Sequence, residues 1–165
     1  MSILSVVLGL VIIQRLAELV IAARNTRVLR AAGATEIDAQ GYPWFLALHA
    51  AWLGSLALTV PQATVPSWPL LCLFAALQVA RIWVIASLGS RWTTRIIVLP
   101  GRPLVRTGPY RFLRHPNYAI VAAEIAVLPL AFGAIAAALM FSIANLVLIA
   151  RRVAIENRAL RLIEV

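Results

Sequence analysis

Apolar stretches long enough to cross a membrane dominate this chain of 165 residues. Hydrophobic residues make up 62% of it and charged residues only 13%, and the hydrophobic residues occur in continuous blocks rather than at amphipathic helical spacing. We therefore predict an all-α integral membrane protein with a single domain over residues 1–165. The blocks predict five transmembrane helices, over residues 3–23, 44–60, 68–88, 118–132 and 134–150.

The distribution of arginine predicts how these helices are oriented. Every basic residue apart from the two histidines is an arginine, and thirteen of the fifteen lie in segments 24–43, 89–117 and 151–165. The positive-inside rule places these three segments in the cytoplasm, with the N-terminus outside and the C-terminus inside. The first fourteen residues carry no charge, which predicts a retained helix rather than a cleaved signal peptide. We expect membrane lipids, not nucleic acid, to be its partners.

A basic loop rich in proline leads into the fourth predicted helix. Pro116 suits the first turn of a helix, so this helix should start near Asn117. Earlier in the loop, the β-branched residues of 92–98 are followed by a Pro-Gly pair, which predicts an extended segment and a turn. We expect these residues to form a hairpin or an irregular cap on the cytoplasmic face.

Polar residues form a layer inside the membrane. At about 1.5 Å per residue, six of them lie at similar depth near the cytoplasmic side: Arg15, Glu18, His49, Arg81, Glu124 and Asn145. Ionisable groups at such depth face the interior of a bundle, pair with one another or line a wet cavity. Two interpretations stay open, namely the neutralising pairs Arg15 with Glu18 and Arg81 with Glu124, or a polar substrate pocket. No cluster has metal-ligand spacing, so no metal is predicted.

Two motifs resemble those of a known enzyme family. The first comprises Gly108-Pro109-Tyr110 and Arg114-His115-Pro116-Asn117-Tyr118, and the second comprises Arg152, Ile155-Glu156 and Leu160. Over residues 91–160 the sequence resembles the isoprenylcysteine carboxyl methyltransferase superfamily of integral membrane methyltransferases. The run from Trp92 to Tyr118, together with residues 14–18, is similar to a short bacterial branch linked to O-methylation of alkylpyrones and phenolic lipids. Asn157 stands where the eukaryotic enzymes have a second acid.

This resemblance implies that S-adenosylmethionine binds at the cytoplasmic face, in a cofactor-binding region formed by residues 91–118 and 151–160, the second being a C-terminal extension of the fifth helix. Carried over residue by residue, the cofactor contacts would be Arg102, Pro103, Leu104, Val105, Tyr110, His115, Pro116, Asn117, Tyr118 and Glu156. Arg152 would meet the substrate. A helix N-terminus opened by Pro116 suits the carboxylate of the cofactor, and the carboxylate of Glu156 can accept hydrogen bonds from both hydroxyls of a ribose.

We accordingly expect an S-adenosylmethionine-dependent O-methyltransferase acting on a lipophilic acceptor from the bilayer. An enol or phenol acceptor must lose a proton, for which Glu124 or His49 is the candidate base. A carboxylate acceptor needs no base, and Arg152 alone could orient it. Alternative interpretations are a prenylcysteine carboxyl or phospholipid amine methyltransferase, a small proton-coupled transporter that uses Glu18, and a scaffold without activity. The oligomeric state is not predicted.

Overall fold

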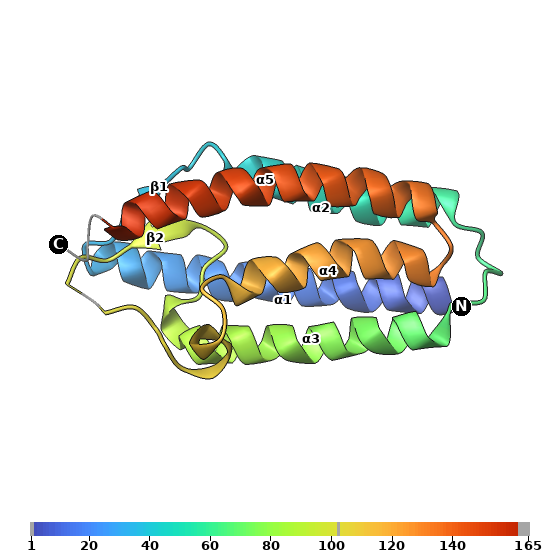
Figure 1. Ribbon diagram of the computed structural model, residues 1–165, viewed down its shortest axis with the longest axis horizontal. Helices are drawn as coiled ribbons and strands as arrows, with labels where there is room; N and C mark the ends of the chain where they lie inside the picture. The colour runs from blue at the N-terminus through green and yellow to red at the C-terminus, as the bar shows by residue number, and fades with distance from the viewer. Residues whose placement is uncertain (1, 102, 162–165) are drawn as a thin grey trace.

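Five α-helices form the fold in the part of the chain that the structure describes (Figure 1). The computed structural model describes residues 2–101 and 103–161, with the side chains of residues 160 and 161 left out, so the predicted contact at Arg102 lies outside the described residues. The helices are α1 (Ile3–Ala31), α2 (Tyr42–Thr59), α3 (Trp68–Leu88), α4 (Pro116–Ala131) and α5 (Ile135–Arg161). The remaining elements are the strands β1 (Thr35–Ile37) and β2 (Ile96–Val98) and the 3-10 helices η1 (Gly89–Arg91) and η2 (Gly108–Arg111).

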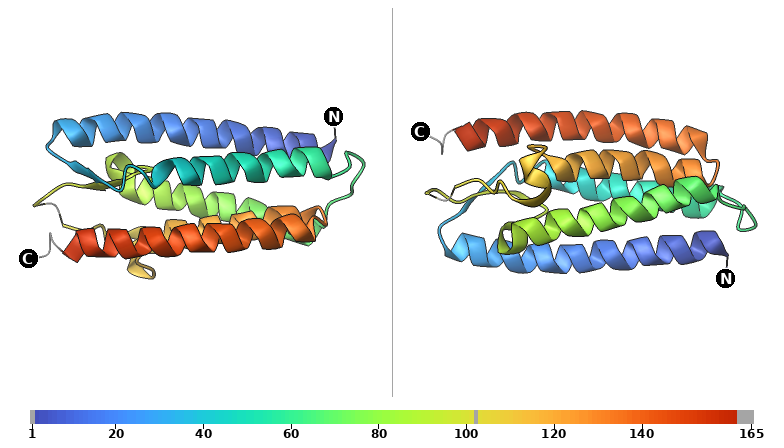
Figure 2. Two further views of the ribbon diagram at one scale, coloured as in Figure 1. Left: turned by 90° about the horizontal axis from the view of Figure 1, so that it is seen from above. Right: turned by 60° about the horizontal axis from the view of Figure 1, so that its bottom comes forward.

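The helices lie lengthwise in one bundle, with their connections at two ends (Figures 1 and 2). The N-terminus and the short α2–α3 and α4–α5 connections lie at one end. The other end, here called the cap end, carries β1, β2 and the last turns of α5 (Figure 1). Proline occupies the first turn of α2, α3 and α4, where its missing amide hydrogen costs nothing. The predicted start of the fourth helix near Asn117 is thereby confirmed.

The outer surface of the bundle is apolar. Large hydrophobic side chains such as Ile13, Val20, Val79 and Val147 are each at least 65% exposed. A surface of this kind suits lipid rather than water. Within the described residues, three helices are long and apolar enough to cross a membrane. They are α1 (Ile3–Ala31), α3 together with η1 (Trp68–Arg91), and the part Ile135–Ala159 of α5, while the apolar helix α4 is shorter. The chain is therefore an integral membrane protein.

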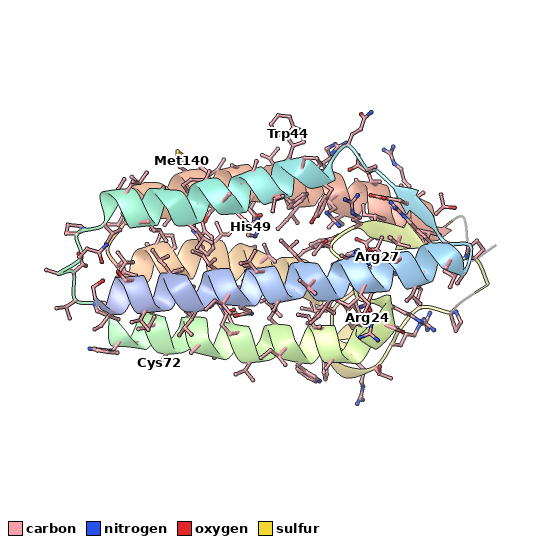
Figure 3. The ribbon with its side chains drawn as sticks, turned by 180° about the vertical axis from the view of Figure 1, so that it is seen from behind. Arg24, Arg27, Trp44, His49, Cys72 and Met140 are labelled. Atoms are coloured by element: carbon pink, nitrogen blue, oxygen red, sulfur yellow. The ribbon has the colours of Figure 1, made fainter. Side chains whose placement is uncertain are left out.

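Two helices extend well past their predicted spans; the extension of α5 was predicted and is confirmed, whereas that of α1 was not predicted. The helix α1 continues to Ala31 and α5 to Arg161, whereas the apolar blocks end near residues 23 and 150. Hydropathy marks the part of a helix that lies in lipid, and it does not mark where the helix ends. Both extensions reach the cap end, where they carry arginine side chains; Figure 3 shows Arg24 and Arg27 there on α1.

The tightest packing lies away from the cap end. The largest fully buried apolar side chains include Leu4 of α1, Trp52 and Leu56 of α2, and Ile125 and Leu128 of α4, and all five belong to one core cluster. This cluster uses the N-terminal part of α1 and the C-terminal parts of α2 and α4. The cap half of the bundle is left with room for a cavity.

A two-stranded sheet covers the cap end. β1 pairs antiparallel with β2, so that Thr35 lies opposite Val98. The predicted extended segment is confirmed as β2, but its partner β1 was not predicted. Glu36 of β1 pairs with Arg30 of α1 and, at 2.5 Å, with Arg95. Burial alone would raise the pKa of Glu36, but the hydrogen bonds from both arginines hold that pKa below its usual value.

Candidate functional site

A cavity of about 1550 Å³ opens at the cap end and continues between α1 and α2. The cap loops, the start of α4 and the end of α5 form its polar end. Eight of the ten predicted cofactor contacts line it: Pro103, Leu104, Val105, Tyr110, His115, Asn117, Tyr118 and Glu156. Pro116 is buried and does not line the cavity, so its contribution is to begin the helix rather than to touch a ligand.

Side chains from α4 and α5 meet in a chain of hydrogen bonds. The Tyr118 hydroxyl donates to Glu156 Oε2 at 2.6 Å and accepts from Arg152 Nε at 2.8 Å. Arg152 Nη2 donates to the carbonyl of Thr94 at 2.7 Å, and its guanidinium lies 5.0 Å from the ring centre of Phe45. These contacts fix the guanidinium in place at the cavity wall. Arg152 lines the cavity, and its Nη1 takes part in none of these hydrogen bonds within the described residues.

Asn157 holds the imidazole of His115. The Nε2 atom of His115 lies 3.0 Å from Asn157 Oδ1, and because an amide oxygen only accepts, Nε2 carries the hydrogen. The ring also lies 5.5 Å from that of Tyr118. The sequence interpretation assigned no role to Asn157, although its position beside Glu156 in the second motif was the available signal. The structure makes it the residue that orients a predicted cofactor contact.

The start of α4 offers polar groups to a ligand. Asn117 lines the cavity, and its Oδ1 is buried without a hydrogen-bond partner in the described part of the chain. Tyr110 of η2 lines the same end; burial, together with the nearby Glu156 carboxylate, raises the pKa of its phenol, which stays protonated. A free acceptor at Asn117, the carboxylate of Glu156 and a helix N-terminus together suit a ligand with both amino and carboxylate groups.

Four charged residues of the polar layer form one network instead of two separate pairs. Arg15 bonds Glu18 and Glu124 at 2.8 and 2.7 Å, and Arg81 bonds the same two carboxylates at 2.7 and 2.9 Å. Gln78 donates to the other oxygen of Glu124 at 2.9 Å. Both expected pairs are therefore present, and the two further pairs, Arg15–Glu124 and Arg81–Glu18, join them so that the charges of α1, α3 and α4 balance jointly.

This network changes the roles expected of two predicted residues. Glu124 is 1% exposed, does not line the cavity and accepts from both arginines, so the structure does not support it as a base. Glu18 is similarly held by Arg15 and Arg81. Asn145 is fully buried and takes no part: neither atom of its amide has a partner within the described residues.

His49 is the predicted base that reaches the cavity. It lines the cavity from α2, on the side that faces the other helices, whereas Trp44 points outward (Figure 3). Its Nδ1 atom lies 2.8 Å from the carbonyl oxygen of Phe45. Because a carbonyl only accepts, Nδ1 carries the hydrogen and Nε2 of the neutral ring keeps a free electron pair. This is the tautomer that a base requires.

The fold and the site define a helical membrane protein with a polar pocket beneath a basic cap, and comparison with known proteins gives its family. Residues 70–162 match the profile of the isoprenylcysteine carboxyl methyltransferase (ICMT) family. The chain is also 36% identical, over 158 residues, to the uncharacterized protein YpbQ of Bacillus subtilis (strain 168), an alignment that covers 93% of this chain and 94% of that protein. No solved structure matches it significantly. The chain belongs to the ICMT family, which confirms the resemblance and supports a membrane methyltransferase.

Proposed function

We propose that the chain is an S-adenosylmethionine-dependent methyltransferase that transfers a methyl group to an oxygen of a lipophilic acceptor. The observation that carries this proposal is the shape of the cavity, which joins the motif residues at the cap end to an apolar space between α1 and α2. A polar cofactor and a water-insoluble acceptor could thus meet in one space. A methyltransferase that acts on a water-soluble acceptor would not need the apolar part of this cavity between α1 and α2.

The proposed topology has five spans, with the N-terminus outside and the cap end in the cytoplasm of a bacterial inner membrane. It is supported by the bundle, in which the described parts of the three arginine-rich segments all lie toward the cap end (Figure 1). S-adenosylmethionine would then reach the polar end of the cavity from the cytosol, where it is made, and the acceptor would arrive through the bilayer.

The residues at the polar end fit this cofactor. Asn117 Oδ1 is an unpartnered acceptor for its ammonium group, and the N-terminus of α4 suits its carboxylate. Glu156 can accept hydrogen bonds from the ribose hydroxyls. When bound, S-adenosylmethionine supplies a methyl group on a positively charged sulfur. An oxygen can attack this methyl group and displace the sulfur without metal or acid assistance.

The protein's own side chains would orient the acceptor and remove its proton. Nη1 of Arg152 can bind the acceptor oxygen, because Tyr118 and Thr94 already hold the rest of the guanidinium. The free electron pair on Nε2 of His49 can take the proton of a hydroxyl. A carboxylate acceptor would not use this base, so the placement of His49 favours an enol or phenol.

The alternatives find less support. A phospholipid amine would bring positive charge against Arg152, and a proton-coupled transporter needs a membrane carboxylate that can exchange protons. Glu18 accepts from Arg15, Arg81 and Gln14 at 3.0 Å or less. Prenylcysteine carboxylates remain the second class of acceptor to test, because Arg152 could bind them equally well.

Calorimetry of S-adenosylmethionine with the detergent-purified protein tests the proposal. We expect His115→Ala and Glu156→Ala each to weaken binding by about tenfold or more, or ~1.4 kcal/mol. Arg158→Ala is the matched control, because this exposed residue of α5 does not line the cavity. Absence of binding to well-folded wild type would refute the proposal. Transfer of labelled methyl to an alkylphenol, a prenylcysteine or a phospholipid then identifies the acceptor class.

A further inference from the structure

The cavity has an apolar arm that extends beyond the polar layer. It runs between α1 and α2 and is lined by Leu8, Gly9, Ile12, Ala50, Leu53, Gly54 and Ala57. Gly9 lies six residues from Arg15 along α1, and Gly54 lies five residues from His49 along α2. At about 1.5 Å per residue, both glycines are roughly 8 to 9 Å deeper than the polar layer. The two glycines thus face the arm at the same level.

These glycines leave space open rather than allow close packing. Glycine inside a helix costs stability relative to alanine, and it is usually explained by another backbone that approaches closely. A Cβ atom added to Gly9 or Gly54 would meet no other atom within 4 Å. At Gly41, by contrast, a Cβ would collide with Asp38 and Arg151. The packing of the protein therefore does not require Gly9 or Gly54.

The arm reaches the protein surface both at its far end and along one side. Ser5 and Gln62 line the cavity there, and the Ser5 hydroxyl donates to Gln62 Oε1 at 2.7 Å. Nearer the cap, Ile12, Leu16 and Leu46 line the cavity and are still 44 to 57% exposed. A residue that lines the cavity and is also exposed lies at the rim of the cavity. The arm therefore opens toward the surrounding lipid between α1 and α2.

We propose that this arm holds a hydrocarbon chain of the methyl acceptor, and that Gly9 and Gly54 set the length of chain that fits. This inference rests on the proposed function, which places the reacting oxygen at Arg152. From there a chain would pass His49 and the two glycines and end at the Ser5–Gln62 pair. A longer chain would have to displace that hydrogen bond and place hydrocarbon at the exposed polar surface beyond it.

The arm would select acceptors by the length of their hydrocarbon chain, through steric exclusion. A chain that moves from the bilayer into the arm exchanges one apolar environment for another, so its burial adds little affinity. Chains up to the limit should bind alike, and longer ones should bind poorly. Narrowing the arm at the level of the glycines should move that limit to shorter chains.

The test uses Gly54→Leu with two alkylphenols, one with a pentyl and one with a pentadecyl chain. Binding is measured by calorimetry in detergent without cofactor. We expect the variant to bind pentadecylphenol about tenfold or more weakly than the wild type does, and pentylphenol equally well. Ala51→Leu is the matched control, because it adds the same side chain to the exposed face of α2. Gly9→Leu repeats the test from the opposite wall of the arm.

Equal loss of both ligands, or loss of neither, in the two glycine variants would overturn the inference. Failure of the proposed function would look different. In that case wild type would bind the alkylphenols with the predicted dependence on chain length, but it would not bind S-adenosylmethionine or transfer a methyl group to them. The cofactor-free measurement therefore separates the two conclusions.

Discussion

Replacing Glu124 by glutamine should destabilise the protein strongly, because it unbalances the four-charge network. In the wild type, two carboxylates face two guanidiniums, with all four ion pairs between 2.7 and 2.9 Å. Glutamine keeps the shape of the side chain and an oxygen for the arginines. It leaves Arg15 and Arg81 with Glu18 as their one carboxylate, and hence one uncompensated positive charge among side chains that are at most 13% exposed.

The magnitude follows from two independent scales. Removing one partner of a buried ion pair costs about 3 to 5 kcal/mol, and placing a charge at the centre of a membrane helix costs about 2.5 to 3.5 kcal/mol. We therefore expect Glu124→Gln to lower the free energy of unfolding by about 3 to 4 kcal/mol. Arg81→Gln should cost a similar amount, because it leaves two carboxylates with one guanidinium and hence one uncompensated negative charge. In the double variant Glu124→Gln/Arg81→Gln, the remaining charges of Arg15 and Glu18 balance. This variant should be more stable than the sum of the two single losses predicts.

Reversible unfolding in mixed micelles of mild detergent and dodecyl sulfate measures these changes. The double-mutant cycle should give a coupling between Glu124 and Arg81 of about 2 kcal/mol or more, near the upper range for residues in one network. A cost below about 1 kcal/mol for Glu124→Gln, or additive losses, would show that the four charges do not balance jointly. The pH profile of methyl transfer should stay unchanged in Glu124→Gln; a lost limb would restore this residue as the base.

Three further predictions concern the cap end. Tyr118→Phe should cost about 1 to 3 kcal/mol in thermal unfolding, because the buried guanidinium that donates to this hydroxyl loses an acceptor; an unchanged melting temperature would contradict this. Gly41→Ala should break the exposed Asp38–Arg151 pair at a cost of no more than about 1 kcal/mol, yet increase proteolytic cleavage of the α1–α2 connection. The lowered pKa of Glu36 stabilises the fold above about pH 4.5, and this contribution is lost as the pH falls through the lower folded value. Melting curves against pH should therefore lose less stability on acidification in Glu36→Gln than in wild type.

The sequence was sufficient for the helices and for the start of the site. Continuous apolar blocks and proline at helix starts predict features that depend on neighbours in the chain, so the five helices and the start at Pro116 agree with prediction. The grouping of the motif residues of α4 and α5 around one cavity was predictable in the same way, since the two motifs carry most of the polar groups near the cap, while their roles stay predictions. The first motif lies at the start of α4 and the second lies near the end of α5. Because both of these helix ends lie toward the cap, their motif residues line the same cavity.

Pairings between distant segments could not be predicted in this way. Depth placed the four charged residues in one layer and suggested two pairs that the structure contains. It did not predict the cross pairs Arg15–Glu124 and Arg81–Glu18, because these depend on the rotation of each helix. β1 is three residues long and contains Glu36, and a segment this short shows no usable alternation. Asn157 was set aside because it differs from the acid of related enzymes, whereas its amide oxygen meets a histidine from another helix.

The four-charge network also has a consequence for how the chain enters the membrane during synthesis. Arg15 and Glu18 bond each other within α1, so this helix can enter lipid already balanced. Arg81 is the only charged residue of α3, and Glu124 is the only charged residue of α4. Neither helix can neutralise its charge alone, and α4 is made after the long basic loop. We expect α3 to wait at the insertion machinery until α4 emerges, so that the two helices leave it as a pair.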